Sequence, residues 1–167
     1  MSLVVLLAFL NVAGQEQPAS NHAGSLSELS DKARMLLVVF KSRVVDVNND
    51  ERAIIQDVLK GDRTPRGRYA WVYNEIAAKL NKYIKNHGSM LAARNLAEAE
   101  YVIFFNVVEF RRIINRLYAY GELFVIIKGS PRDQKPPRIV WRAKKVRIST
   151  DAIGDLIKDL KTFRGES

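Results

Sequence analysis

The side chains best suited to metal chemistry are few and lie far apart. His22 and His87 are the two histidines, and cysteine is absent. A zinc-type site needs three or four such ligands at short, regular spacing, which these residues do not provide. The acidic and amide residues of 46–51 lack the glycine and the distal glutamate of a calcium loop. The sequence therefore predicts neither a metal site nor a cofactor.

Nucleophilic and phosphate-transfer chemistry lack their motifs as well. Serine never occurs in a Gly-x-Ser-x-Gly context. His87, the one candidate base outside the N-terminal region, lies in a segment typical of a helix end, next to Gly88. Residues 61–67 have neither the spacing nor the Lys-Ser/Thr ending of a phosphate loop.

One carboxylate pair has the residue types needed for glycoside hydrolysis. Glu109 and Glu122 are expected on adjacent strands, where two carboxylates can flank a glycosidic bond. Arginines at 111, 112 and 116 lie close by and favour cross-strand ion pairs instead. We therefore predict that the protein is not an enzyme.

A basic segment near the C-terminus is the first candidate binding site. It carries five positive charges with no acid between them: Arg138, Arg142, Lys144, Lys145 and Arg147. The chain as a whole has a net charge of +9, which favours anionic partners through long-range attraction. Lysine and arginine also protect edge strands from pairing with other chains, so this segment is either an anion site or a solvated edge.

Trp71 is the second candidate, as a possible interface residue. On a helical projection it lies opposite Tyr73 and Leu80, on a side that also carries lysines. An indole in that position is either covered by residues 44–59 or exposed as a contact point. We expect it to be covered, because an exposed indole leaves a large apolar area in water.

The N-terminal residues are typical of an export signal. Residues 3–10 form an uncharged apolar run, and residues 12–14 supply the small side chains required before a cleavage site. The alternative is a buried N-terminal strand or helix. The run falls short of the roughly 20 apolar residues that span a bilayer, and no cysteine follows it for lipid attachment. We expect a signal peptide at 1–14, a flexible linker at 15–33 and one domain at 34–167.

Hydrophobic periodicity predicts a single domain of the α+β or α/β class, with a mixed, mostly antiparallel sheet of about four to five strands and two main helices. The expected strands are 34–41, 101–110, 118–128 and 138–148, and the helices are 64–88 and 150–164. Residues 44–62 fit a short helix or a strand of a hairpin, and we favour the helix. The first main helix is long enough to connect 34–41 to 101–110 as parallel neighbours.

This order of elements resembles a known group of proteins. It comprises an exported leader, a strand, a helix, a long strand opened by Leu96-Ala97-Glu98-Ala99-Glu100-Tyr101-Val102, a meander and a last helix. The pattern is similar to small exported bacterial α/β envelope proteins of unknown function. It is more distantly similar to the N-terminal domain of TolB and to the auxiliary lipoproteins of transport systems.

The resemblance implies an exported interaction module, periplasmic or secreted, with an envelope protein as partner. The missing catalytic motifs predict that this module is non-enzymatic, and the short apolar run predicts no transmembrane anchor. The alternative function is an anion-binding protein that uses the basic segment to bind an envelope polymer, anionic lipid or nucleic acid. Export disfavours nucleic acid as the partner.

Overall fold

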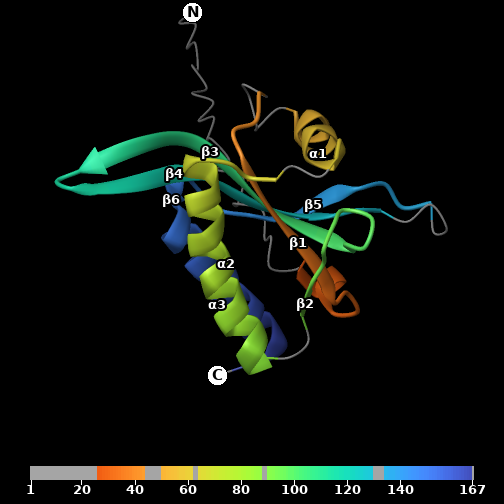
Figure 1. Cartoon of the computed structure of the whole chain (residues 1–167). Coiled ribbons are helices and arrows are strands. Elements are labelled where there is room, and N and C mark those ends of the chain that lie inside the picture. The colour runs from red at the N-terminus through yellow and green to blue at the C-terminus, as the bar shows by residue number, and fades with distance from the viewer. Residues whose placement is uncertain (1–25, 44–49, 62–63, 88–89, 130–133, 167) are drawn as a thin grey trace, which may run out of the picture.

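The computed structural model describes residues 26–43, 50–61, 64–87, 90–129 and 134–166. The expected signal peptide at 1–14 and the first part of the expected linker lie outside the described residues. So do His22 and Gly88. The described part forms one compact α+β fold, with three α-helices and a mixed sheet (Figure 1).

The sheet has six strands, with the order β2-β1-β3-β4-β5 and with β6 also paired to β4. Its strands are β1 (Arg34–Phe40), β2 (Leu91–Ala92), β3 (Tyr101–Ile113), β4 (Arg116–Ile127), β5 (Arg138–Arg142) and β6 (Arg147–Ile148). β1 is parallel to both β2 and β3, whereas β4 is antiparallel to β3, β5 and β6. The predicted mixed sheet is therefore confirmed, with slightly more strands than expected.

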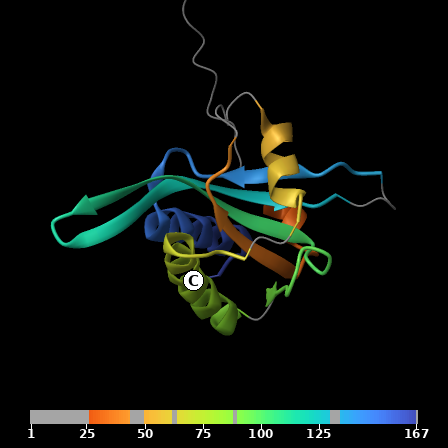
Figure 2. The same ribbon diagram turned by 45° about the horizontal axis from the view of Figure 1, so that its top comes forward.

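Helices cover both faces of this sheet. α2 (Arg68–His87) and α3 (Ser149–Arg164) lie side by side on one face, and α1 (Glu51–Leu59) lies on the other (Figures 1 and 2). The helical interpretation of 44–62 is thus confirmed for residues 51–59. Asp50 begins α1, because its side chain accepts a hydrogen bond from the Ala53 N–H at 2.9 Å.

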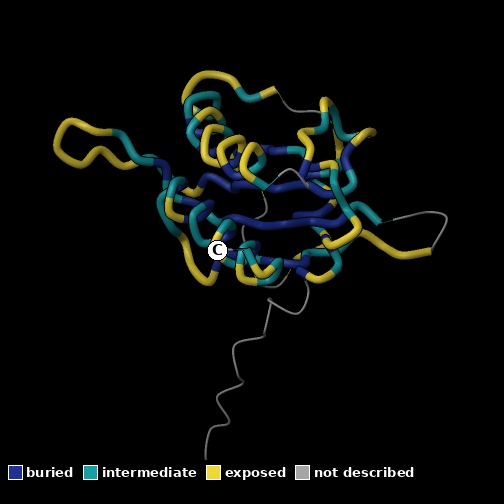
Figure 3. Tube along the Cα trace, turned by 90° about the horizontal axis from the view of Figure 1, so that it is seen from below, coloured by how far each residue is buried: buried dark blue, intermediate teal, exposed yellow. Residues whose placement is uncertain are grey.

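Two hydrophobic cores lie on opposite faces of the sheet. Alternation along β3 divides its side chains: Ile103 and Phe105 join the core under α2 and α3, whereas Val102 and Phe104 join the core under α1. This is why residues 101–108 of β3 are apolar at every position but Asn106. Figure 3 shows its consequence, a buried sheet between exposed helix surfaces.

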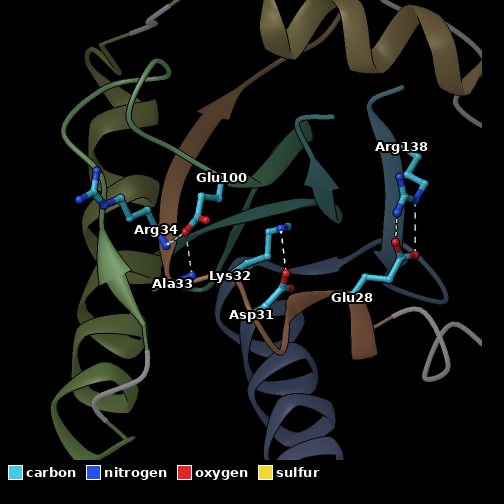
Figure 4. Close-up of polar contacts among 7 residues, drawn as sticks. All are labelled: Glu28, Asp31, Lys32, Ala33, Arg34, Glu100 and Arg138. Carbon is cyan, nitrogen blue, oxygen red and sulfur yellow. Dashed lines mark hydrogen bonds and ion pairs between the residues drawn. The ribbon is translucent and has the colours of Figure 1, made fainter. Parts of the chain in front are cut away.

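The expected linker extends too far into the domain. Leu26–Leu29 form a 3₁₀ helix whose two leucines are almost fully buried in the core under α2 and α3. The Arg138 guanidinium forms an ion pair with Glu28, and the Glu100 carboxylate accepts hydrogen bonds from the N–H groups of Ala33 and Arg34 at 2.9 and 2.8 Å (Figure 4). Residues 26–33 therefore belong to the domain.

Two other boundaries differ from the sequence-based expectation. The strand expected at 138–148 is two short strands, because residues 143–146 leave the sheet before β6 pairs with Tyr120 and Gly121 of β4. α2 begins at Arg68, after Gly67 turns the chain at a φ of +57°. The break in the strand thus follows from pairing with β4, whereas the start of the helix follows from the local turn at Gly67.

The hairpin of β3 and β4 continues well past the helices. We call residues 108–118 the arm; it projects from the body in all views (Figures 1, 2 and 3). The register shifts between Val107 and Glu109, so that Val108 is the extra residue of a β-bulge opposite Gly121 and Tyr120. The bulge bends the ribbon where it leaves the body, and from there the two strands pair continuously to the Ile113–Arg116 pair.

Candidate functional site

The turn of the arm has an unusual residue in a strained conformation. Ile113 pairs with Arg116, so the turn contains only Ile114 and Asn115. Ile114 has a φ of +55°, a region that β-branched residues rarely adopt and that hairpin turns normally give to glycine or asparagine. Ile114 is also 90% exposed and Ile113 is 45% exposed. Neither packing nor turn chemistry therefore explains an isoleucine at 114.

One face of the arm carries charged and aromatic side chains. The Arg111 guanidinium lies 2.5 Å from the Glu109 carboxylate and 5.0 Å from the centre of the Tyr120 ring. By contrast, Arg112 and Arg116 have no carboxylate within ion-pair distance among the residues that the structure describes. The end of the arm thus combines two isoleucines with two uncompensated positive charges.

The other face of the arm is fastened to α2. The Tyr69 ring meets the Phe110 ring edge-on at 5.7 Å between centroids, and the Arg68 guanidinium lies 5.8 Å from the Phe110 centroid. Edge-to-face aromatic pairs are favourable at this separation. The root of the arm is therefore fixed, while its end has no neighbour among the residues that the structure describes.

A pocket of about 560 Å³ lies between the arm, α2 and the start of α3. It is lined by Trp71 and Glu75 from α2, by residues 116–119 from β4, and by Ile148 and Thr150. The Ser149 hydroxyl donates a hydrogen bond to Glu75 at 3.3 Å, and the Lys79 ammonium donates to the Thr150 carbonyl at 2.8 Å. These bonds connect α2 to α3 at the pocket wall.

The prediction that residues 44–59 cover Trp71 is wrong for residues 50–59, the part of that range that the structure describes. α1 packs against the opposite face of the sheet, whereas Trp71 is half-buried against the core under α2 and α3. Residues 44–49 of the expected cover lie outside the described part. Trp71 instead lines the pocket beside the arm, so its role as a contact point stays a prediction.

The basic segment is not one continuous patch of free charge. Arg138 pairs with Glu28, Arg142 pairs with Glu122 at 3.0 Å and lies over the Phe124 ring, and Arg147 pairs with Asp155 at 3.2 Å. Lys144 and Lys145 are exposed on the connection between β5 and β6, with no carboxylate partner in the described ranges. Because β6 pairs with β4 at Tyr120 and Gly121, these two lysines lie near the root of the arm.

The two glutamates considered for glycoside hydrolysis are both ion-paired. Glu109 pairs with Arg111, and Glu122 pairs with Arg142 rather than with the arginines of the arm. Their strand partners also differ, since Glu109 lies opposite Tyr120 and Glu122 lies opposite Asn106. Both carboxylates are thus ion-paired, but the cross-strand pairs expected with Arg111, Arg112 and Arg116 are not formed: Glu109 pairs within its own strand, and Glu122 pairs with an arginine of β5.

A second polar cluster fixes the C-terminus and includes His87. Glu166 accepts a hydrogen bond from the Tyr83 hydroxyl at 2.8 Å and lies 3.2 Å from His87 Nδ1. Burial and the Glu166 hydrogen bond raise the pKa of Tyr83 to about 12. The buried Tyr101 hydroxyl has no hydrogen-bond partner within the described ranges, and burial raises the pKa of Tyr101 as well. These tyrosines therefore stay neutral near pH 7, and the cluster acts as an anchor for the last helix.

Among the described residues, no three metal-ligating side chains gather in one place, and none of the helices is both long and apolar enough to cross a bilayer. The fold and this surface define a small α+β protein with a projecting hairpin arm. Comparisons with protein-family models, curated proteins and solved structures each returned no match.

The arm was not predicted from the sequence. Its signal is the segment Arg111-Arg112-Ile113-Ile114-Asn115-Arg116, which joins two apolar strands without glycine or proline. An isoleucine in a two-residue turn, directly after another isoleucine at the strand end, is unusual, because turn residues are normally polar or glycine.

Proposed function

We propose that this protein is an exported, non-enzymatic interaction module that contacts an envelope partner through the arm and the adjoining pocket. The observation that carries the proposal is the exposed Ile113–Ile114 pair at the end of a strained turn. Strained, exposed apolar residues persist where a contact outside the chain uses them. The resemblance to exported envelope proteins and the apolar run at 3–10 support export.

We propose no catalytic chemistry because the glutamates that could supply it are held in contacts with other side chains. Glu109, Glu122 and Glu75 each hold a partner in the described structure, so their carboxylates are occupied by structural interactions. The pocket wall offers Trp71, Leu117 and Ile148, side chains suited to holding an apolar group. Binding is the role that these residues support best.

Anion binding is a second candidate, favoured by one specific observation. Arg112, Arg116, Lys144 and Lys145 have no carboxylate partner in the part of the chain that the structure describes, and they lie on or near the arm. The basic segment alone offers two such charges, whereas the arm and the lysines together offer four. An anionic partner would therefore engage the arm as well as the segment between β5 and β6.

Site-specific photocrosslinking in the native host tests the interaction. A benzoylphenylalanine at position 114 should give covalent products, because the arm end lies in the interface. The matched control is position 56, where Gln56 is exposed on α1, on the other side of the sheet. Equal yields at 114 and 56, or none at 114, would contradict the proposal.

Export is tested by the mass of the mature chain from the native host. Cleavage after Gly14 should leave Gln15 as the first residue, because residues 12–14 match the small side chains that a signal peptidase selects. Intact Met1 or Ser2 on protein recovered from the cytoplasm would remove export from the account.

A further inference from the structure

We propose that the end of the arm inserts into the interface of an anionic lipid bilayer, with Ile113 and Ile114 at the acyl boundary and Arg112 and Arg116 at the phosphate headgroups. This inference rests on the proposed interaction module and names the surface that it contacts. It concerns a reversible contact by an exposed turn and no membrane-spanning segment.

Exposed apolar side chains are concentrated on the arm. Val108, Ile113 and Ile114 are three of the large apolar side chains that the described residues leave exposed, at 41, 45 and 90%. Ile113 and Ile114 stand at the outermost point of the hairpin, where no other element of the described structure approaches. Ile114 has a left-handed φ, and a glycine or a polar residue at this position would relieve the backbone strain.

Positive charge surrounds the isoleucines at a depth that suits a bilayer surface. Arg116 pairs with Ile113 and shares its face of the ribbon, whereas Arg112 points to the opposite face. The backbone of Arg116 is level with Ile113, and that of Arg112 lies one residue, about 3 Å, further from the turn, so both long side chains can reach back from the tip. Interfacial segments bury their apolar side chains about 5–10 Å into the headgroup and acyl boundary, which places these arginines among the phosphates.

Two other occupants fit the arm less well. A second copy would bring two arms of the same net positive charge together, since each carries three arginines against Glu109 alone. A nucleic acid duplex can accept arginines on its phosphates and an apolar wedge between bases. The leader-like run at 3–10 places the chain away from nucleic acid and next to anionic lipid, so we favour the lipid surface.

The first experiment relies on the absence of cysteine from the sequence, which permits labelling at a single introduced site. Ile114→Cys and the control Gln56→Cys are each labelled with an environment-sensitive fluorophore. On vesicles of phosphatidylglycerol and phosphatidylcholine, the label at 114 should shift to the blue and be quenched by brominated acyl chains, and the label at 56 should do neither. Vesicles of phosphatidylcholine alone should give a smaller shift. No shift at 114 on anionic vesicles overturns the proposal.

The second experiment measures vesicle binding of unlabelled variants by flotation, with circular dichroism to confirm folding. Ile113→Ser with Ile114→Ser should weaken binding about tenfold or more, because two apolar side chains are lost from the interface. Arg112→Gln with Arg116→Gln should also weaken binding and flatten its salt dependence. Lys144→Gln with Lys145→Gln removes the same charge away from the tip and should have the smaller effect.

Three results would overturn the lipid assignment: equal binding by the tip variants and the wild type, a larger loss in the lysine variant, or binding to a DNA duplex without binding to vesicles. These outcomes separate the two proposals. Crosslinking of a protein at 114 without a vesicle response contradicts only the lipid assignment. Failure of both experiments contradicts the interaction module as well.

Discussion

Ile114 occupies a backbone region that disfavours its own side chain. A β-branched residue with a φ of +55° carries a strain of about 1–3 kcal/mol, and Ile114 forms no buried contact that offsets it. Such strain is tolerated when a residue is used for something other than stability.

Replacing Ile114 with glycine should therefore raise the free energy of unfolding by about 0.5–1 kcal/mol, because glycine adopts positive φ without strain. Ile113→Gly is the matched control, and it should lower that free energy because Ile113 lies in a paired strand. Urea titration of both variants measures the difference. If both changes destabilise the protein equally, Ile114 is not strained.

The charged carboxylate of Glu100 holds the start of β1 by two hydrogen bonds. Its carboxylate accepts the N–H groups of Arg34 and Ala33, and these hydrogen bonds, the one to Arg34 foremost, lower the pKa of Glu100 from its usual value of 4.5 (Figure 4). A lowered pKa in the folded state contributes stability above the unfolded-state pKa, and this stability is lost as the pH falls through the folded-state pKa.

Glu100→Gln should cost about 1 kcal/mol at pH 7, since a charge-assisted pair of hydrogen bonds becomes a neutral one. The difference from the wild type should shrink as the pH falls below 4.5 and through the lowered folded-state pKa of Glu100, because the wild-type carboxyl then becomes protonated too. Asp31→Asn is the control, because the Asp31 side chain is 74% exposed, and it should change stability little. A pH-independent loss in the Glu100 variant would show that its charge does not matter. Thermal unfolding from pH 3 to pH 7 makes the comparison.

At the scale of elements, the bulge at Val107–Glu109 decides how the arm leaves the body. Gly121 lies opposite Val107 at this point, and a Cβ there would overlap the Asn106 carbonyl oxygen and come within 2.7 Å of the Phe105 ring. The close approach of the two strands therefore requires glycine. Gly154 in α3 is a natural contrast, because a Cβ there meets nothing within 4 Å.

Gly121→Ala should lower the free energy of unfolding by about 2 kcal/mol or more, because backbone has to move. Gly154→Ala should raise it by about 0.5–1 kcal/mol, since alanine favours a helix interior. Chemical denaturation of the two variants tests the pair. A mild effect at Gly121 would mean that β3 and β4 can separate there at little cost.

Long apolar runs made β1, β3 and β4 predictable from the sequence. Apolar side chains at helical spacing did the same for α2 and α3. The short elements were harder. Leu26 and Leu29 stand among serines and glycine, so their burial depends on a surface supplied by distant residues. The break at 143–146 follows from pairing with β4, and the basic segment loses three of its charges to Glu28, Glu122 and Asp155, which lie far away in the sequence or across a turn.

The location of Trp71 shows a different limit. Periodicity correctly places Ile76 and Leu80 of α2 in the core, but it does not say which face of the sheet α1 will cover. The two cores on opposite faces require α1 and α2 to lie apart, which leaves Trp71 beside the arm. Local patterns thus predicted the elements, whereas the candidate site arose from their assembly.

Over the whole molecule, the end of the arm is separate from the two hydrophobic cores. The cores lie between the sheet and its three helices, and the end of the arm adds nothing to either core (Figure 3). Changes at the tip can therefore alter binding without unfolding the body. This separation is what allows the tip variants to be interpreted as binding mutants.

Hydrogen exchange read by mass spectrometry, with and without envelope membranes from the native host, tests the central claim most directly. The arm should be the contact surface, so peptides covering 108–118 should exchange about tenfold more slowly with membranes, because bound turns open less often. Peptides covering α1 should exchange at the same rate in both samples. Protection of α1, or of any face of the body, while 108–118 stays unchanged would contradict the account.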